Sequence, residues 1–216
     1  APAIWYLARL ELGTGGVIGG TIPGLPVILS GRSADLGWAI TSSYMDDQDL
    51  YLEELNPDDP EQYRTPDGFA PFETRRSIIE IAGTTPVTLT LRWTDNGPVL
   101  PGTQYDLSTI TPPGHVMSLA WTALSPRDTT YSAALGVMRA GDVDTALAAA
   151  EGYVAPSQNL TLVDRDTIAM KTIGAMPRRT ARHQSQGRLP SPGWLAINRW
   201  QGRSPYAANP EFVAPR

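Results

Sequence analysis

The amino-acid sequence predicts a strand-rich α+β fold with few short helices. Its 216 residues, 41% of them hydrophobic, suffice for one substantial core or for a domain with a smaller lobe attached. Its 20 glycines and 20 prolines interrupt the chain at roughly every fifth position, which leaves room for few long helices. The segments between them are short and rich in β-branched side chains, a pattern that favours strands joined by tight turns.

Residues 1–60 are expected to form one compact β unit of core sheet strands and an acidic loop. The run AIWYLARLEL (3–12) is short and aromatic, and in residues 13–31 glycine alternates with β-branched residues, so we predict strands joined by turns. GWAITSSYM (37–45) is a further strand candidate. DDQDLYLEEL (46–55) indicates an acidic loop that leads into the next strand.

Residues 61–120 are expected to form a β-rich antiparallel meander. Strand-like runs occur at RSIIEIAG, PVTLTLRWT and GPVL (76–83, 86–94 and 97–100). Turn residues lie before these runs, at 66–68 (Pro-Asp-Gly), and between the last two of them, at 95–97 (Asp-Asn-Gly). The second triplet is a strong hairpin signal.

Residues 121–176 contain the two short helices that the sequence predicts. The run SPRD (125–128) provides a helix start with proline at its first position, and this helix is expected to end near Gly141. Asp142 can cap a second helix, rich in alanine, that Gly152 closes.

Strand patterns flank these helices. SLAWTAL (118–124) precedes them and indicates a buried strand, and NLTLVDRDTIAMKTIGAM (159–176) follows them and predicts a hairpin that turns at residues 164–166. Residues 177–216 are rich in Arg, Gln, Gly and Pro, and we expect them to form an extended tail rather than a regular element.

Charge and composition exclude several classes of function. The formal net charge is −5, and no basic run is longer than the pairs Arg75-Arg76 and Arg178-Arg179, so nucleic acid is not an expected partner. The absence of cysteine excludes disulfides, thiolate zinc sites and a thiol nucleophile. No window approaches the ~18 apolar residues of a membrane span, and the first residues lack the charged start of a signal peptide. Any export signal is expected outside this segment.

Few residues suit nucleophilic catalysis. A serine triad needs a histidine, and the chain offers only His115 and His183, both in loops where we expect them to face solvent. No G-x-S-x-G motif accompanies them. GTGGVIGG (13–20) lacks the lysine and the Ser or Thr of a phosphate loop, and its glycines are typical of turns.

Three carboxylates lie within the four residues Asp46-Asp47-Gln48-Asp49, which suits a hard cation that binds many oxygens. A solvated acidic turn explains the same pattern equally well. Trp38 and Trp121 lie in apolar strand segments, where they either pack in the core or form the wall of a pocket.

The order of several motifs resembles the start of the large subunit of the penicillin acylase family. The family's succession of an aromatic pair, a Pro-Gly turn, a Gly-x-Asn turn, a Trp-x-x-Thr strand and an Asp-Asp-x-Asp loop is matched by Trp5-Tyr6, Pro23-Gly24, Gly31-Arg32-Ser33, Trp38 to Thr41 and Asp46 to Asp49. The runs DNGPVL, SLAWTAL, NLTLVDRDTIAM and GAMPRR follow in the family's order, so the resemblance spans nearly the whole chain. Two departures are Ser33, where the family usually has asparagine, and Ala39, where glycine is common.

The resemblance implies a fold and a nucleophile. The fold is part of the four-layer αββα sandwich of N-terminal nucleophile hydrolases, with an antiparallel β-rich insertion. The nucleophile is a serine that self-cleavage exposes as the first residue of the large subunit. Because Ala1 has no hydroxyl, the resemblance implies that this sequence starts downstream of that serine and is inactive alone.

Catalytic and binding roles also follow from the resemblance. The serine hydroxyl attacks an amide carbonyl while its α-amino group, with an unperturbed pKa of ~8, takes the proton. The backbone N–H of Ser42 is one oxyanion donor, and the second is an asparagine expected beyond Arg216. The acyl-pocket positions are Ser30, Ile40, Trp121 and Gln158. Since Ser30 replaces a large aromatic residue, an aliphatic acyl chain is expected, as in acyl-homoserine-lactone acylases.

The expected partners are a small acyl-amide substrate, such as a penicillin or an acyl-homoserine lactone, and the small subunit of the same precursor in the periplasm or outside the cell. No cofactor is expected for the chemistry. The resemblance does imply a structural calcium ion, bound by Asp46, Asp49 and the carbonyls of Gln48 and Gly187, with the other ligands outside this chain. The alternative function is a non-catalytic β-rich binding module on an acylase-like scaffold.

Overall fold

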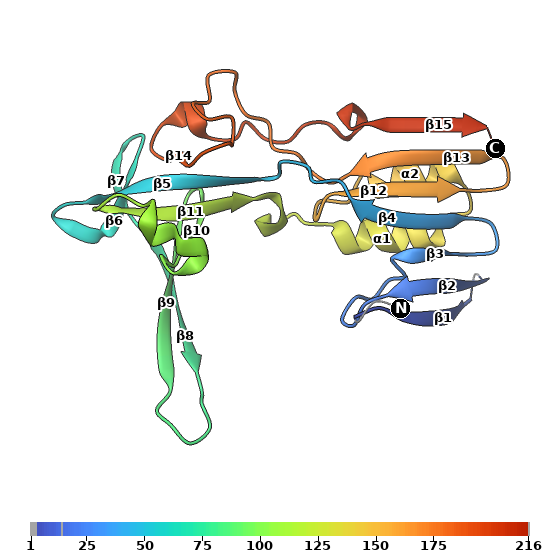
Figure 1. The fold of residues 1–216 in the computed structure, drawn as a ribbon, viewed down its shortest axis with the longest axis horizontal. Coiled ribbons are helices and arrows are strands. Elements are labelled where there is room, and N and C mark those ends of the chain that lie inside the picture. The colour runs from blue at the N-terminus through green and yellow to red at the C-terminus, as the bar shows by residue number, and fades with distance from the viewer. Residues whose placement is uncertain (1–3, 14, 216) are drawn as a thin grey trace. The chain divides into compact units, whose positions relative to one another are not determined.

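A computed structural model describes residues 4–13 and 15–215, and it divides the chain into two compact units (Figure 1). The first unit comprises residues 1–45, 125–176 and 204–216, and the second comprises residues 46–124 and 177–203. Each unit therefore joins segments that are distant in the sequence. Ala1 and Arg216, on which the expectations about the nucleophile and the second oxyanion donor depend, lie outside the described residues.

The first unit is built on a seven-stranded antiparallel sheet. In spatial order its strands are β1 (Tyr6–Leu12), β2 (Gly15–Thr21), β3 (Ser30–Arg32), β4 (Gly37–Ser42), β12 (Gln158–Val163), β13 (Thr167–Ile173) and β15 (Glu211–Pro215). Helices α1 (Thr130–Arg139) and α2 (Val143–Ala150) cover one face of this sheet (Figure 1). A sheet with one helical layer is half of the four-layer arrangement that the resemblance implies.

The core of the first unit lies between the sheet and the two helices. Buried strand residues such as Trp38 and Leu160 meet Val137 and Ala146 of the helices. Because side chains alternate between the faces of a strand, Trp38 and Ile40 of β4 and Leu160 and Leu162 of β12 face this core. The indole N–H of Trp38 donates to the carbonyl of Ile28 at 2.9 Å, so its polar atom is satisfied inside the core.

The two predicted helices are present, but α1 begins at Thr130 rather than at Pro126. Residues 125–128 close a separate turn instead, in which the N–H of Asp128 donates to the carbonyl of Ser125 at 3.1 Å. The Asp128 carboxylate then accepts the N–H of Thr130 at 2.9 Å. The predicted cap of α2 is confirmed, because the Asp142 carboxylate accepts the N–H of Thr145 at 2.7 Å.

Glycines let β2 and β3 approach each other closely. A Cβ on Gly19 would lie 2.2 Å from the carbonyl oxygen of Ser30, and one on Gly31 would lie 2.4 Å from that of Ile18. No other residue fits at these two positions without moving the backbone. The glycines of residues 13–31 thus permit close strand packing as well as turns.

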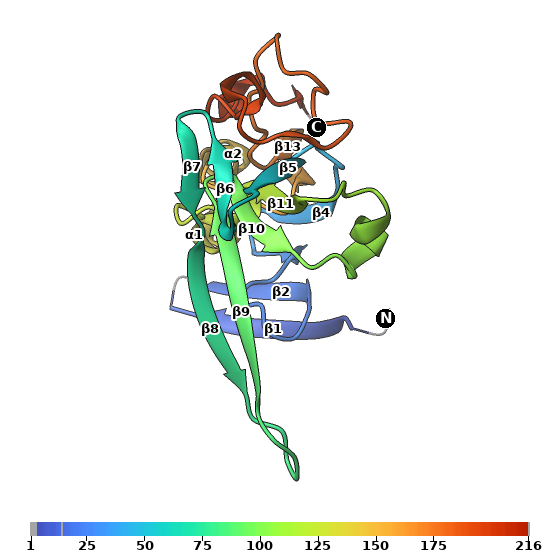
Figure 2. The same ribbon diagram turned by 90° about the vertical axis from the view of Figure 1, so that its left-hand side faces the viewer.

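The second unit is built on an eight-stranded sheet. Its strands are β7 (Gly68–Pro71), β6 (Asp59–Thr65), β5 (Gln48–Asn56), β11 (His115–Trp121), β10 (Gly97–Leu100), β9 (Val87–Thr94) and β8 (Glu73–Ile79) in spatial order, with β14 (Ser191–Pro192) added parallel to β5. Both predicted hairpins are confirmed, since β6 pairs with β7 and β9 pairs with β10 across the expected turns. Strands β8 and β9 run on as a long two-stranded arm (Figure 2).

Four single-turn or irregular 3-10 helices complete the described elements: η1 (Gln104–Thr109), η2 (Thr122–Leu124), η3 (Ala196–Asn198) and η4 (Tyr206–Ala208). No helix in the described part of the chain has the length and apolarity needed to cross a bilayer.

A buried carboxylate organises the middle of the second sheet. Glu53 of β5 is fully buried, and its Oε1 accepts hydrogen bonds from Thr94 (2.9 Å), Asn96 (2.9 Å) and Ser118 (2.6 Å). These donors come from β9, from the turn before β10 and from β11. The network therefore fixes the hairpin turn that the sequence predicted, because a buried carboxylate must keep its donors.

Two expectations about chain organisation are wrong. Residues 1–60 do not form one β unit, because the chain leaves the first sheet after β4 and β5 pairs in the second sheet. Residues 177–216 are not a plain extended tail either. β14 pairs with β5, β15 forms an edge of the first sheet, and the hydroxyl of Tyr51 donates to the carbonyl of Asn198 at 2.7 Å.

Asp164 is predicted to stabilise the first unit in a pH-dependent way. Its carboxylate accepts the N–H groups of Val143 (2.9 Å), Asp166 (2.9 Å) and Thr167 (2.7 Å), and these bonds, that of Val143 first, lower the pKa of Asp164. Because the folded-state pKa is lowered, the stabilisation is present above the unfolded pKa and is lost as pH falls through the folded value. Thermal unfolding at neutral pH should show a lower Tm for Asp164→Ala, and the deficit should shrink below about pH 4.

Asp166→Ala is the matched control, since Asp166 lies in the same turn with an exposed side chain. Equal losses of Tm in the two variants would contradict this role of Asp164.

Candidate active site

Four of the predicted site residues lie together on adjacent strands of the first unit. Ser42 and Ile40 are on β4, Ser30 is on the neighbouring β3, and Gln158 is on β12 directly opposite Ser42. The N–H of Ile40 donates to the Ser30 hydroxyl at 3.4 Å. Since residues two apart on a strand share a face, as do directly paired residues, Ile40, Ser42 and Gln158 point to the same side of the sheet.

This side is the one that the helices cover, as the position of Trp38 two residues before Ile40 shows. Ile40 packs partly against the core, Gln158 is buried and Ser42 is exposed. The environment therefore changes from apolar to solvent-accessible along β4.

The backbone after Ser42 is held in place by Ser157. The N–H of Ser43 donates to the Ser157 carbonyl at 3.4 Å, and that of Met45 donates to the Ser157 hydroxyl at 3.2 Å. Gly174 permits this arrangement, because a Cβ there would lie 2.9 Å from the Cα of Ser157. The Ser42 N–H therefore lies between β4 and a loop that Ser157 holds in place.

Trp121 belongs to the second unit, at the end of β11. Its indole N–H donates to the Asp47 carboxylate at 3.3 Å. The side chain lines a cavity of about 600 Å³ whose apolar walls include Leu50, Leu100, Leu107, Leu119, Leu189 and Pro190. Trp121 is therefore a cavity wall rather than a core residue.

The predicted calcium ligands converge on the guanidinium of Arg179. Asp49 accepts two hydrogen bonds from it, Nε to Oδ2 at 2.9 Å and Nη2 to Oδ1 at 2.8 Å, and Nη1 lies 3.1 Å from Asp46 Oδ2. The carbonyl of Gln48 is 3.4 Å from Nη2. A Cβ on Gly187 would lie 2.6 Å from Asp49 Oδ1 and 2.7 Å from Arg179 Nη2. The arrangement fits an arginine and does not fit a calcium ion.

The ion pair between Asp49 and Arg179 is shielded from solvent, with side-chain exposures of 3% and 6%. Burial acts to lower the pKa of Arg179, but hydrogen bonding and charge from Asp49 outweigh it, so the pKa is raised and the guanidinium stays charged. Trp200 adds an indole N–H to Asp49 Oδ2. No group of three or more His, Cys, Asp or Glu side chains among the described residues could hold a metal ion.

The expectation that the two histidines face solvent is wrong for His183, which is 4% exposed. Its Nδ1 accepts the N–H groups of Ser185 (3.3 Å) and Gln186 (3.0 Å), so the ring proton is on Nε2. That nitrogen lies 4.0 Å from Asp49 Oδ2. No serine hydroxyl bonds to His183 or to the partly exposed His115 in the described part of the chain, which leaves no Ser-His-Asp triad there.

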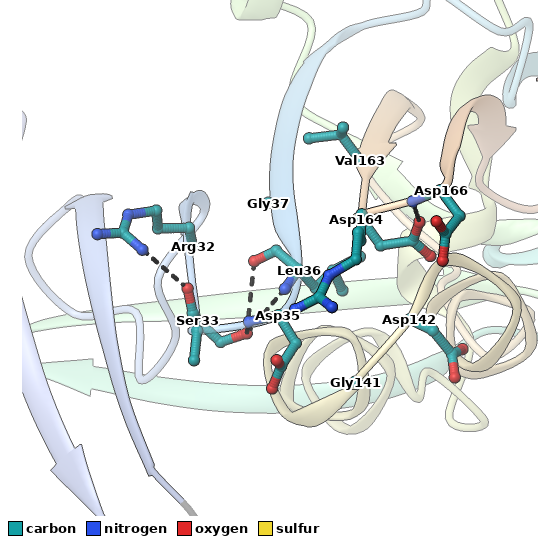
Figure 3. A pocket seen from close by; sticks show the side chains of 12 residues that line it. Arg32, Ser33, Asp35, Leu36, Gly37, Gly141, Asp142, Val163, Asp164 and Asp166 are labelled. Carbon is teal, nitrogen blue, oxygen red and sulfur yellow. Dashed lines mark hydrogen bonds between the residues drawn. The ribbon is translucent and has the colours of Figure 1, made fainter. Parts of the chain in front are cut away.

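A second cavity, of about 610 Å³, lies at the other end of β4 and β12 from Ser42 (Figure 3). Its polar side chains are engaged in turns. The Ser33 hydroxyl accepts the N–H groups of Asp35 (3.2 Å) and Leu36 (3.1 Å), so Ser33 can close the turn where the resembling family has asparagine (Figure 3). Asp142 and Asp164 cap α2 and the β12–β13 turn. This cavity therefore lies among the turn at residues 33–36, the start of α2 and the β12–β13 turn.

Comparison with known proteins decides the family. The family model for penicillin amidase matches residues 1–216. This chain belongs to the penicillin amidase family.

The family relatives are bacterial acylases. The chain is 28% identical over 214 residues to the acyl-homoserine lactone acylase QuiP of Pseudomonas syringae pv. tomato, covering 98% of this chain and 25% of that protein. It is 25% identical over 220 residues to the penicillin acylase 2 proenzyme of Pseudomonas sp. strain SE83, covering 99% of this chain and 26% of the proenzyme. The chain thus spans about a quarter of the length of the curated relatives it matches.

The fold is also that of a solved acylase. The thermostable penicillin G acylase from Alcaligenes faecalis matches with a TM-score of 0.85 and 26% identity, over 99% of this chain and 37% of the acylase chain. The strand-rich α+β fold expected from the sequence is therefore confirmed.

The substitution Gly187→Ala tests the contact between the acidic loop and Arg179. The φ of Gly187 is +81°, and alanine there would clash with both Asp49 and Arg179, so Gly187→Ala should lower the Tm by several degrees. Gly202 is the matched control, because its φ is +92° but nothing lies within 4 Å of an added Cβ. Gly202→Ala meets only backbone strain and should lose less. If both variants melt at the same temperature, Gly187 does not pack against the ion pair.

Proposed function

We propose that this chain is a section of an amide hydrolase that removes an acyl chain from a small amide, either an acyl-homoserine lactone or a penicillin. The observation that carries the proposal is the family match over all 216 residues. Both kinds of named relative, the acyl-homoserine lactone acylase and the penicillin acylase, act on such amides by name.

In this proposal an N-terminal serine outside this sequence is both nucleophile and base. Its hydroxyl attacks the amide carbonyl and its α-amino group takes the proton. The chain's own contribution is the backbone N–H of Ser42, which stabilises the oxyanion from a strand that Ser157 holds in place. Losing one such donor costs about 3–4 kcal/mol of transition-state stabilisation.

The first unit favours an aliphatic acyl group. Ile40 offers an apolar surface, and Ser30 leaves room where aryl-accepting relatives are expected to have an aromatic ring. The remaining pocket wall is proposed to come from the small subunit of the same precursor. We place the complete protein in the periplasm or outside the cell, as the family resemblance implies.

A non-catalytic binding module on the acylase scaffold is the alternative. It is favoured only by the lack of a nucleophile in the described part of the chain, where no serine hydroxyl bonds to a histidine. The complete gene separates the two functions, since the enzyme needs a Gly-Ser, Gly-Cys or Gly-Thr junction shortly upstream and the module does not.

Expression of the complete gene should yield two subunits, with a serine, or less often a cysteine or threonine, at the new N-terminus of the larger one. N-terminal sequencing and a mass measurement check this, and substitution of the new terminal residue by alanine should abolish both processing and hydrolysis. The isolated 216-residue chain should hydrolyse neither substrate. A single uncut chain with full activity would contradict the proposed function.

A further inference from the structure

The acidic loop presents its oxygens to nitrogen donors. A calcium ion takes six to eight oxygens at about 2.3–2.6 Å, with no N–H group among them. Here both oxygens of Asp49, Oδ2 of Asp46 and the carbonyls of Asp46 and Gln48 all face the guanidinium of Arg179. The residues that the family resemblance assigns to calcium are thus satisfied by one side chain of the same chain.

We propose that Arg179 is the permanent cation of the acidic loop, and that the loop keeps its shape without calcium. Arginine suits this place because its planar fork matches a carboxylate with two parallel hydrogen bonds, as seen at Asp49. Its Nη1 also reaches Asp46, so one guanidinium bridges both carboxylates. The inference concerns the fold of the second unit and does not depend on the proposed hydrolysis.

Gly187 and Trp200 lie in direct contact with the ion pair. Gly187 is in direct contact with the pair, since a single added carbon would lie 2.7 Å or less from both Asp49 Oδ1 and Arg179 Nη2. On the other side the indole N–H of Trp200 points at Asp49 Oδ2. Calcium would have to compete with Arg179 for both oxygens of Asp49.

The charges around Asp49 oppose the replacement of Arg179 by a calcium ion. Arg179 is 6% exposed, so its displacement would leave a buried cation without its carboxylate partner. A divalent ion entering without displacement would instead lie close to the guanidinium charge, because both would contact the same oxygens of Asp46 and Asp49. In the observed arrangement the buried charges of Asp49 and Arg179 are paired with each other.

Thermal unfolding of the complete protein tests the proposal, measured in calcium chloride and in EGTA for the wild type and for Asp46→Asn. Asp46 is the milder change, because its side chain is 52% exposed. We expect the effect of calcium on Tm to be the same for both proteins, since any ion bound elsewhere contributes equally. A ligand bound only by the folded state raises its Tm. A calcium-dependent gain that the wild type shows and Asp46→Asn lacks would overturn the proposal.

Arg179→Met provides the second test, because it keeps the apolar stem and removes the charge. We expect its Tm to fall by several degrees in EGTA, and an unchanged Tm would overturn the proposal, since a cation that holds the loop cannot be dispensable. If this variant does not fold, terbium luminescence of the wild type decides instead. Trp200 lies against Asp49 and would sensitise a bound ion. Saturable emission that Asp46→Asn abolishes would overturn the proposal, and equal emission in the two proteins supports it.

Discussion

The buried ion pair between Asp49 and Arg179 is the interaction on which the second unit depends. It joins the start of β5 to residues 177–203, a segment that otherwise contributes only the two-residue strand β14 to the sheet. His183 and Trp200 come from the same segment and lie around the same carboxylate. Removing one partner of such a buried pair typically costs about 3–5 kcal/mol, because the other charge is left uncompensated. The pair therefore adds a buried charged contact to the hydrogen bonds that Tyr51 and β14 make between this segment and the sheet.

In the first unit, hydrogen bonds between uncharged groups hold distant segments of the chain together. Ser157 holds the backbone beyond Ser42 through two hydrogen bonds, and Gly174 lets β13 approach it. The side-chain amide of Asn209 in turn donates to the carbonyls of Thr172 and Gly174, at 3.1 and 3.2 Å. The proposed oxyanion donor thus rests on a chain of hydrogen bonds that ends in the C-terminal segment.

Local patterns predicted the local structure of this chain. Turn residues located the hairpins after Thr65 and Thr94, and Asp142 located the start of α2, because each of these signals acts within a few residues. Long-range pairing could not be predicted in the same way. No local pattern shows that β15 would join β13, that β5 would leave the first sheet, or that Arg179 would reach back 130 residues to Asp49. Only the family resemblance pointed to Ser42 and Gln158, whose roles stay predictions, and it also suggested calcium ligands that in the structure face Arg179.

A crystal structure of the complete protein, from crystals grown in calcium chloride, tests most directly whether Arg179 holds the acidic loop without calcium. The measurement is the set of distances around Asp49, together with any anomalous signal from calcium. We expect Nε and Nη2 of Arg179 to remain within hydrogen-bond distance of both Asp49 oxygens, with no ion between them. An ion at about 2.3–2.6 Å from Asp46, Asp49 and the Gln48 carbonyl, with Arg179 turned away, would contradict it.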